Sequence, residues 1–303
     1  MKKIALIDLG SNSARMSVAE LTDSGYLELF RRREMVRLSQ GMSLTGGLQE
    51  EPQRRAIAAL ISFAQEAKAE NAKILAVATA AVRRAKNGGE FCARVLAEAG
   101  ITLEVISGKD EANYDFYGVV SAFPDAQDCL IADVGGGSTE LILAQNGAMQ
   151  GKISLPFGAM TLTDRYFRES QDLASAKEEV LSLYREVGLL ESAKGLPLIA
   201  LGGSAGALPY IDARLTRLSV LPDVHGYIIT PERLTAILEE LLSRTPEERI
   251  AQLQLEPGRA DTICAGILPL LLLLQELNSP SLTVCTAGLR EGMLYLMSRG
   301  ELE

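Results

Sequence analysis

Residues 131–143 read Ile-Ala-Asp-Val-Gly-Gly-Gly-Ser-Thr-Glu-Leu-Ile-Leu, and this stretch indicates how the chain is built. An apolar run ends at Asp133, a triple glycine and Ser138 follow, and a second β-prone run begins. Glycines allow positive φ angles and a close approach of the backbone to a ligand. Consecutive amides in such a turn can form an anion site, and a carboxylate beside it can hold a hard cation. Taken alone, the pattern fits either a phosphate-binding turn or an ordinary Gly-rich hairpin.

The same spacing occurs near the N-terminus. Residues 4–13 read Ile-Ala-Leu-Ile-Asp-Leu-Gly-Ser-Asn-Ser, so the pattern Asp-x-Gly-x-x-Ser starts at both Asp8 and Asp133. In both copies it follows an apolar strand. A motif repeated at the start and near the middle of a chain predicts two similar halves that face one ligand.

The composition limits which fold classes and which kinds of partner the chain can have. The chain has 303 residues, of which 47% are hydrophobic, so it can form two domains with sizeable cores. A net charge of −9 argues against a general nucleic-acid or membrane-surface binder, since such binding depends on an excess of Lys and Arg. The four scattered cysteines indicate reduced thiols in a cytoplasmic protein, and with the single histidine, His225, they make a structural zinc site improbable.

No targeting or membrane segment is expected. Lys2 and Lys3 precede only a short apolar run that ends at Asp8, so a signal peptide is not predicted. The apolar run at 263–274 is too short to span a bilayer, and we expect it to be a buried core helix.

Periodicity predicts an α/β fold with a β-meander at the start of each half, unlike a Rossmann start, in which a helix follows the glycine turn. The expected strands are 3–9, 14–21, 26–38, 73–79, 102–106, 129–134, 140–144, 149–155, 198–201 and 282–286. The expected helices are 52–70, 89–99, 107–123, 159–167, 175–193, 231–243, one from about 259, and 289–299, with an irregular region at 212–230. The domains are expected at 1–124 and 125–287, with a final helix at about 288–303 that packs back on the first domain.

Three further groups of residues suggest chemistry. Glu111 follows a Ser107-x-x-Asp110 capping-box pattern and lies in the first turn of a predicted helix, where the helix dipole favours a charged carboxylate that could act as a general base. Arg83 follows a strand end and could bind phosphate bidentately, although a solvated cation fits as well. Glycines and a serine at 202–204 form another loop that could approach a ligand, while tight packing would also explain them. No Walker A pattern is present.

Together these pieces resemble the exopolyphosphatase/guanosine pentaphosphate phosphatase family of the sugar kinase–Hsp70–actin superfamily. The matching stretches occur in family order and cover nearly the whole chain: DLGSNS (8–13), ATAAVRRAKN (78–87), ISGKDEA (106–112), DVGGGSTEL (133–141), LPFGAMTLT (155–163), ALGGSAG (200–206), PGRADTICAG (257–266) and GLREGMLY (288–295). The resemblance implies two actin-like (ribonuclease H-like) domains with a cleft between them.

The resemblance also implies roles for individual residues. Glu111 becomes the base that activates water, and Arg83 a contact of the substrate phosphates. The implied Mg²⁺ ligands, with Mn²⁺ as an alternative metal, are Asp133 together with Asp8 and Glu140. The implied phosphate loops are Ser11, Asn12 and Ser13, then Gly135, Gly136, Gly137 and Ser138, and finally Gly202, Gly203 and Ser204.

The expected reaction is hydrolytic release of the terminal phosphate of inorganic polyphosphate. A pppGpp 5′-phosphohydrolase with the same residues is the nearest alternative, and a non-catalytic sensor of polyphosphate or (p)ppGpp is a third. An actin-like ATPase or sugar kinase is disfavoured by the match at 106–112.

Three departures from the family pattern stand out. Asp110 replaces a common Glu, Ser204 and Ala207 replace frequent threonines, and the C-terminal helical domain of longer relatives is missing. A homodimer is compatible with the sequence.

Overall fold

The structure is a computed structural model that describes residues 2–23 and 25–302. Met1, Ser24 and Glu303, which include the outer ends of the expected domain ranges, lie outside the described residues. The chain divides into two compact units: unit 1 comprises Met1–Ser121 and Ala287–Glu303, and unit 2 comprises Ala122–Thr286. The chain therefore passes between the units twice.

Unit 1 is built on a five-stranded sheet with the order β3-β2-β1-β4-β5. The strands β1 (Lys2–Leu9), β2 (Ser13–Thr22) and β3 (Gly25–Met35) form the antiparallel meander expected from the sequence. β4 (Lys73–Ala78) pairs parallel with β1, and β5 (Leu103–Val105) pairs parallel with β4.

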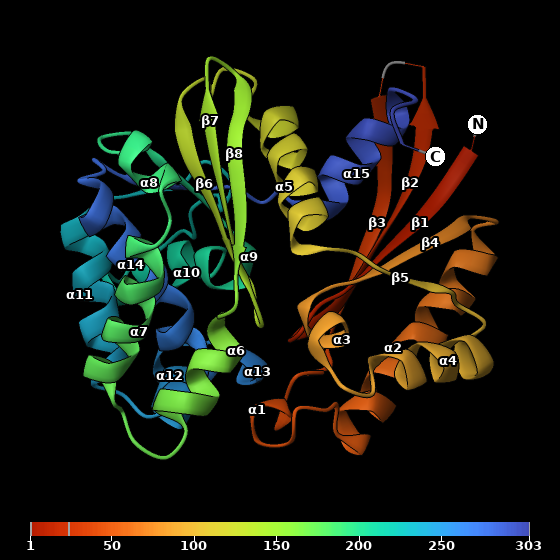
Figure 1. The fold of residues 1–303 in the computed structure, drawn as a ribbon, viewed down its shortest axis with the longest axis horizontal. Helices are drawn as coiled ribbons and strands as arrows, with labels where there is room; N and C mark the ends of the chain where they lie inside the picture. Colours follow the sequence, from red (N-terminus) through yellow and green to blue (C-terminus); the bar gives the residue numbers. More distant parts are fainter. Residues whose placement is uncertain (1, 24, 303) are drawn as a thin grey trace. The chain divides into compact units, whose positions relative to one another are not determined.

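Helices cover both faces of this sheet (Figure 1). On one face, β1 and β2 share a core with α2 (Glu50–Ala69) and α4 (Gly88–Ala99). On the other face, β1 packs against α15 (Leu289–Ser298), and Tyr114 of α5 (Gly108–Ala122) joins this second core. The short helices α1 (Met42–Thr45) and α3 (Ala80–Arg84) complete the unit. Because β1 is buried on both faces, its sequence is a continuous apolar run up to Asp8.

Unit 2 repeats the plan of unit 1. Its sheet has the order β10-β11-β9-β6-β7-β8, in which β6, β7 and β8 form the meander and β9 and β11 extend it in parallel. The additional strand β10 (Ile228–Ile229) pairs antiparallel with β11 at the edge. The other bounds are β6 (Cys129–Val134), β7 (Thr139–Gln145), β8 (Ala148–Leu155), β9 (Leu198–Leu201) and β11 (Leu282–Val284).

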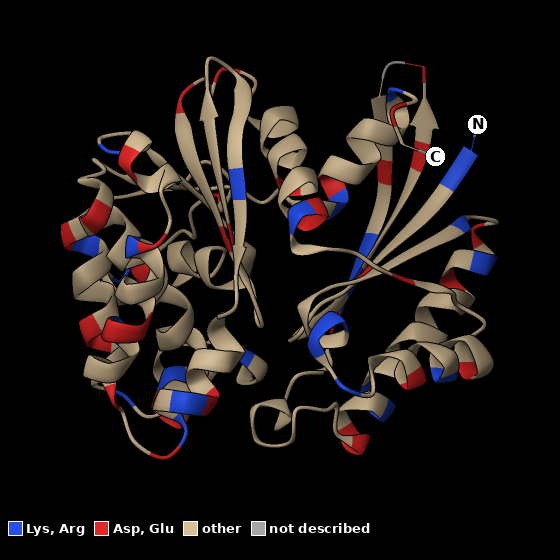
Figure 2. Cartoon of the chain, in the orientation of Figure 1, with Lys and Arg blue, Asp and Glu red and all other residues tan. Residues whose placement is uncertain are grey.

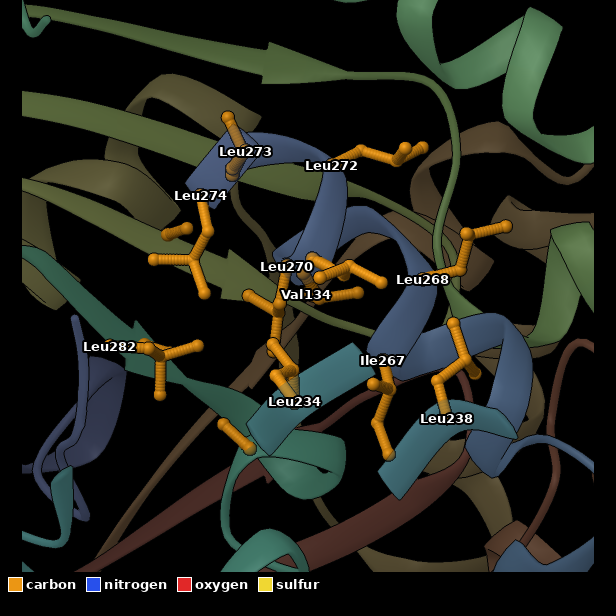
Figure 3. Packing of buried hydrophobic residues seen from close by; sticks show 14 of the residues in the cluster. Val134, Leu234, Leu238, Ile267, Leu268, Leu270, Leu272, Leu273, Leu274 and Leu282 are labelled. Atoms are coloured by element: carbon orange, nitrogen blue, oxygen red, sulfur yellow. The ribbon is translucent and has the colours of Figure 1, made fainter. Parts of the chain in front are cut away.

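The core of unit 2 is organised around α14 (Ile263–Leu277), the apolar run predicted to be a buried helix. Leu268 and Leu270 of this helix lie with Leu234 and Leu238 of α11 (Pro231–Leu242) and with Val134 of β6 (Figure 3).

Within the part of the chain that the structure describes, no helix combines the length and the apolar character needed to cross a membrane. The remaining helices are α6 (Ala159–Leu162), a π-helical turn η1 (Thr163–Phe167), α7 (Leu173–Arg185), α8 (Leu189–Ser192), α9 (Gly202–Ala205), α10 (Leu208–Leu215), α12 (Pro246–Leu253) and α13 (Pro257–Ala260).

In unit 2 one expected helix is interrupted and two helices were missed. The helix expected at 175–193 is interrupted between α7 and α8, where Gly188 weakens the helix. α10 and α12 were not expected. The signal for α12 was present, because Thr245, Pro246 and Glu248 form a capping box in which the Glu248 amide donates to Thr245 Oγ1 at 3.2 Å.

Candidate active site

The two repeated motifs form turns of the same geometry. In the N-terminal turn (residues 10–13) the amide of Gly10 donates to the carbonyl of Ser13 at 3.0 Å, and in the central turn (residues 135–138) Gly135 donates to Ser138 at 3.0 Å. A Cβ on Gly10 or Gly135 would lie 3.3 or 3.2 Å from the same serine carbonyl. The sequence repeat is therefore also a structural repeat.

In each turn, carbonyl groups are bound by the segment that follows the third strand of the meander. In unit 2 the amides of Ala159 and Met160 donate to the carbonyls of Gly135 and Gly136 at 2.9 and 2.8 Å, and Gly158 lies so close that a Cβ would come within 2.6 Å of the Gly135 carbonyl. In unit 1 the carbonyls of Ser11 and Asn12 accept hydrogen bonds from residues 36–39. Carbonyls engaged within their own unit are withdrawn from an approaching anion, which suits a phosphate-binding turn.

In unit 1, three charged residues predicted to belong to the site lie at the carboxyl ends of neighbouring parallel strands. Asp8 is near the end of β1, Arg83 is on α3 after β4, and Glu111 is on α5 after β5. Ligands of open α/β sheets bind at this edge. The basic residues of α3 appear as blue segments in Figure 2.

Arg83 and Glu111 form an ion pair. Arg83 Nη1 donates to Glu111 Oε2 at 3.2 Å and to the Ile106 carbonyl at 2.8 Å. The side chains are 23% and 11% exposed, so most of this contact is removed from water. The cation offsets the cost of burying the carboxylate and fixes its position. Nothing in the spacing of Arg83 and Glu111 along the chain indicates that they contact each other.

The neighbouring acid, Asp110, has a different environment. The Asp110 amide donates to Ser107 Oγ at 3.1 Å, and the Asp110 carboxylate accepts from the Ser107 amide at 3.3 Å and from its hydroxyl at 2.6 Å. The predicted capping box is therefore present. Asp110 is exposed and caps α5, whereas Glu111 is buried and paired, so the base role fits Glu111 better than Asp110.

The aspartates of the two turns face side chains of opposite charge on the neighbouring strand. Asp8 faces Arg15 across the β1–β2 pair, and Arg15 Nε donates to Ser13 Oγ at 3.2 Å. Burial raises the pKa of the Asp8 carboxyl, while the charges of Arg15 and Arg290 oppose that rise. In unit 2 the equivalent position opposite Asp133 is occupied by Glu140.

The carboxylates of Asp133 and Glu140 suit a hard cation. Residues directly opposite in an antiparallel pair project on the same face, so these two acidic side chains are neighbours. Glu140 is fully buried, and its Oε1 accepts from Ser154 Oγ at 2.7 Å. Two adjacent acids with oxygen donors only are the type of site that Mg²⁺ uses, with water and substrate phosphates as further ligands. Among residues 2–23 and 25–302 no group of three or more His, Cys, Asp or Glu side chains converges as a metal site.

The third loop approaches Asp133 through its backbone. Gly202 has φ 90°, and a Cβ there would lie 2.5 Å from Asp133 Oδ1, so only glycine fits beside this carboxylate. Arg259 Nη1 donates to the Gly203 carbonyl. The Ser204 hydroxyl lies against Gly266 of α14, where a Cβ would come within 1.9 Å of it, so this side chain makes a packing contact inside unit 2. A phosphate contact from Ser204 stays a prediction.

Sequence reasoning missed two cations of this region, Arg15 and Arg259. Arg15 could have been found, because it follows Asp8 by seven residues, as Glu140 follows Asp133. The single histidine, His225, lies in unit 2 in the segment between α10 and β10. Its ring stacks on Phe123 with the centroids 4.4 Å apart, and its Nδ1 lies 3.3 Å from Thr286 Oγ1.

Comparison with known proteins identifies the family. The model of the Ppx/GppA phosphatase family matches residues 17–301. An exopolyphosphatase from Cytophaga hutchinsonii is 26% identical with a TM-score of 0.89, covering 100% of this chain and 99% of its own. The Aquifex aeolicus member of the Ppx/GppA family is 28% identical with a TM-score of 0.78, covering 100% and 99%. An exopolyphosphatase-like protein is 26% identical with a TM-score of 0.86, covering 99% and 98%. The fold and the match over nearly the whole length agree, and the chain belongs to the Ppx/GppA phosphatase family.

Proposed function

We propose that the protein is an exopolyphosphatase that releases the terminal phosphate of inorganic polyphosphate by hydrolysis. The observation that carries this proposal is the buried carboxylate of Glu111, held by Arg83 at the carboxyl edge of the unit 1 sheet. Glu111 is in the same unit as the N-terminal turn, and each unit carries one such turn.

Glu111 acts as the general base in this proposal. Its carboxylate accepts a proton from water as the water oxygen attacks the terminal phosphorus in line with the bridging oxygen. The bond from phosphorus to the bridging oxygen breaks, and the shortened chain leaves as the anion. Backbone amides of residues 11–13, in the same unit as Glu111, stabilise the negative charge on the phosphoryl oxygens. Residues 135–138 are the corresponding turn of unit 2. Arg83 keeps the carboxylate in place and contributes positive charge near the phosphates.

Asp133 and Glu140 are the residues that would hold Mg²⁺, with Mn²⁺ as an alternative. Asp8 is the corresponding acid of the turn in unit 1. The bound ion would supply positive charge for the phosphoryl oxygens. Asp8 fits this role less well than Glu140, because Arg15 faces Asp8 in the strand pair. The free cysteines and the family membership fit a protein that acts in the cytoplasm. Its partner there would be polyphosphate.

We favour polyphosphate over pppGpp because the amide-rich turns and Arg83 are groups that suit phosphoryl oxygens. The solved relatives described as exopolyphosphatases support the same choice. The alternative reaction converts pppGpp to ppGpp with the same residues. Phosphate release with Mg²⁺ from short polyphosphate, long polyphosphate and pppGpp, compared side by side, distinguishes the two.

The base assignment is tested with Glu111→Gln, and Asp110→Asn serves as the matched control. We expect Glu111→Gln to lower kcat by at least about 100-fold on every hydrolysed substrate, because a general base contributes on that order. Asp110→Asn should change kcat little, because the amide side chain can still cap α5. Near-normal turnover by a folded Glu111→Gln protein would show that the assignment is wrong. Tight binding of polyphosphate without any phosphate release by the wild type would favour a sensor.

A further inference from the structure

Arg249 is a buried arginine that connects three helices of unit 2. It lies on α12 and is 3% exposed. Its Nε donates to the Leu241 carbonyl of α11 at 2.9 Å, and its Nη1 donates to the Ala260 carbonyl of α13 at 2.8 Å. Both carbonyls belong to the last turn of their helices, where the helix dipole favours a cation.

The two carbonyl contacts explain why this buried residue is an arginine. A buried charged group costs free energy unless its donors are satisfied. The guanidinium holds its donors in a fixed planar arrangement, so one side chain can donate to two separate carbonyls. A lysine has a single charged nitrogen and cannot donate from both positions at once. The role of Arg249 is therefore to join the ends of α11 and α13.

The helix α13 needs contacts of this kind. It has four residues, of which only Ala260 is buried, and a helix of that length is not stable without tertiary contacts. The other end of the connection is firm, because Leu234 and Leu238 of α11 are part of the core of unit 2. Arg249 therefore links the short helix α13 to the core.

The helix α13 carries Arg259, which lies against the third loop (residues 202–204). Arg259 Nη1 donates to the Gly203 carbonyl. A Cβ on Gly203 would lie 3.0 Å from Arg259 Nη2 and 3.1 Å from both Cζ and Nη1, so the face of the guanidinium covers this glycine. The Arg259 side chain is 11% exposed. The adjacent Gly202 lies against Asp133 Oδ1, so a displacement of Arg259 would disturb the backbone beside that carboxylate.

We propose that Arg249 is a positioning residue: it sets α13 so that Arg259 holds the third loop beside Asp133. This inference rests on the proposed function, in which Asp133 would hold the metal. It deepens that function by giving α11, α12 and α13 a part in the geometry of the site. Arg249 acts through α13 and Arg259 and is not itself a ligand of substrate or metal.

The test uses Arg249→Met, Arg249→Lys and the control Leu238→Ala. Arg249→Met keeps an apolar stem but removes both donors, and Arg249→Lys keeps a donor for Ala260 but none for Leu241. Leu238 is 3% exposed in the core, and its truncation destabilises unit 2 while both Arg249 hydrogen bonds stay in place. The control therefore separates a loss of stability from a loss of positioning.

The first readout is the rate at which phenylglyoxal modifies Arg259, followed by mass spectrometry at a temperature at which every variant is folded. We expect modification to be at least about fivefold faster in Arg249→Met, because α13 loses the hydrogen bond that links it to α11. The second readout is kcat on polyphosphate, which should fall at least about tenfold in Arg249→Met and less than about twofold in Leu238→Ala. Arg249→Lys should lie between wild type and Arg249→Met in both readouts.

The modification rate separates this inference from the proposed hydrolysis. If wild type hydrolyses neither polyphosphate nor pppGpp, the hydrolase proposal fails, whereas faster modification in Arg249→Met alone still supports the positioning role. Equal modification rates in wild type and Arg249→Met overturn the inference, and so does an equal increase in Arg249→Met and Leu238→Ala. An active wild type whose kcat is unchanged by Arg249→Met overturns it as well. Should Arg249→Met not fold, Arg249→Lys takes its place in each comparison.

Discussion

The guanidinium of Arg83 contacts Glu111 Oε2 at 3.2 Å and the Ile106 carbonyl at 2.8 Å through the same nitrogen, Nη1. Ile106 is the second residue before Gly108, at which α5 begins. Arg83 thus connects α3 both to the segment that leads into α5 and to the carboxylate in its first turn. A residue expected only to contact substrate also positions the proposed base.

Replacing Arg83 by Gln should therefore lower kcat more than it raises KM. The carboxylate would lose the cation that fixes it, and a displacement of about 1 Å at a catalytic group can cost on the order of 100-fold in rate. Steady-state kinetics on polyphosphate measure this, with Arg84→Gln as the control from the exposed side of the same helix. A pure KM effect in Arg83→Gln would mean that Arg83 only binds substrate.

Glu140→Gln should raise the Mg²⁺ concentration that gives half-maximal activity by at least about tenfold, because the buried site loses one of its two neighbouring charges. The Ser154 hydroxyl can still donate to the Gln oxygen, so the local packing is kept. Ser154→Ala keeps the charge and should cause a smaller shift. Titration of activity with Mg²⁺ tests this, and identical half-saturation in wild type and Glu140→Gln would remove Glu140 from the metal site.

Gly292→Ala should destabilise unit 1 by about 3 kcal/mol, at the upper end of overpacking effects. A Cβ at Gly292 would lie 1.8 Å from the Tyr114 carbonyl, because α15 packs backbone to backbone against α5. Gly89→Ala is the matched control: it is also a helical glycine, but a Cβ there meets nothing within 4 Å.

For Gly89→Ala we expect a gain of about 0.5–1 kcal/mol, because alanine restricts the unfolded chain and favours the helix. Urea unfolding followed by circular dichroism gives both values. Equal stabilities for the two variants would contradict the close α5–α15 packing.

Two buried cysteines should make the protein less stable at alkaline pH. Burial raises the pKa of the Cys129 and Cys264 thiols to about 11 each. In the unfolded chain a thiol ionises at about 8.5. Between these values the folded state holds more protons than the unfolded state, so stability is fully present below about pH 8.5 and is lost as the pH rises towards 11.

The loss should approach about 3 kcal/mol per thiol at pH 11, since the pKa differs by about 2.5 units between the two states and one unit corresponds to about 1.4 kcal/mol. The free energy of unfolding at pH 8 and pH 10.5, compared between wild type and a Cys129→Ala/Cys264→Ala variant, isolates this effect from other alkaline groups. The variant should lose less stability than wild type over this interval. An equal loss would show that these thiols are not protected from ionisation.

Local sequence signals predicted most strands and the start of α5. The meander strands are set by apolar runs bounded by turn residues, and Asn146 and Gly147 adopt φ 52° and 71° in the expected hairpin. The capping box at Ser107 and Asp110 depends only on residues three apart. Such features are decided within a few residues, so a single sequence reveals them. The repeated motif also predicted two similar halves, and each sheet does contain a β-meander that carries the motif.

What the sequence by itself determined is the duplicated turn, the family and the identity of the candidate acids. Only the tertiary structure decided which of these groups contact each other. Arg83 and Glu111 are 28 residues apart and meet because β4 and β5 are neighbours in the sheet. Ser204 turned out to face Gly266, and Arg259 came to lie against Gly203, which is 56 residues away in the chain. Strand pairing and close packing set these distances, and both depend on contacts that no local spacing encodes.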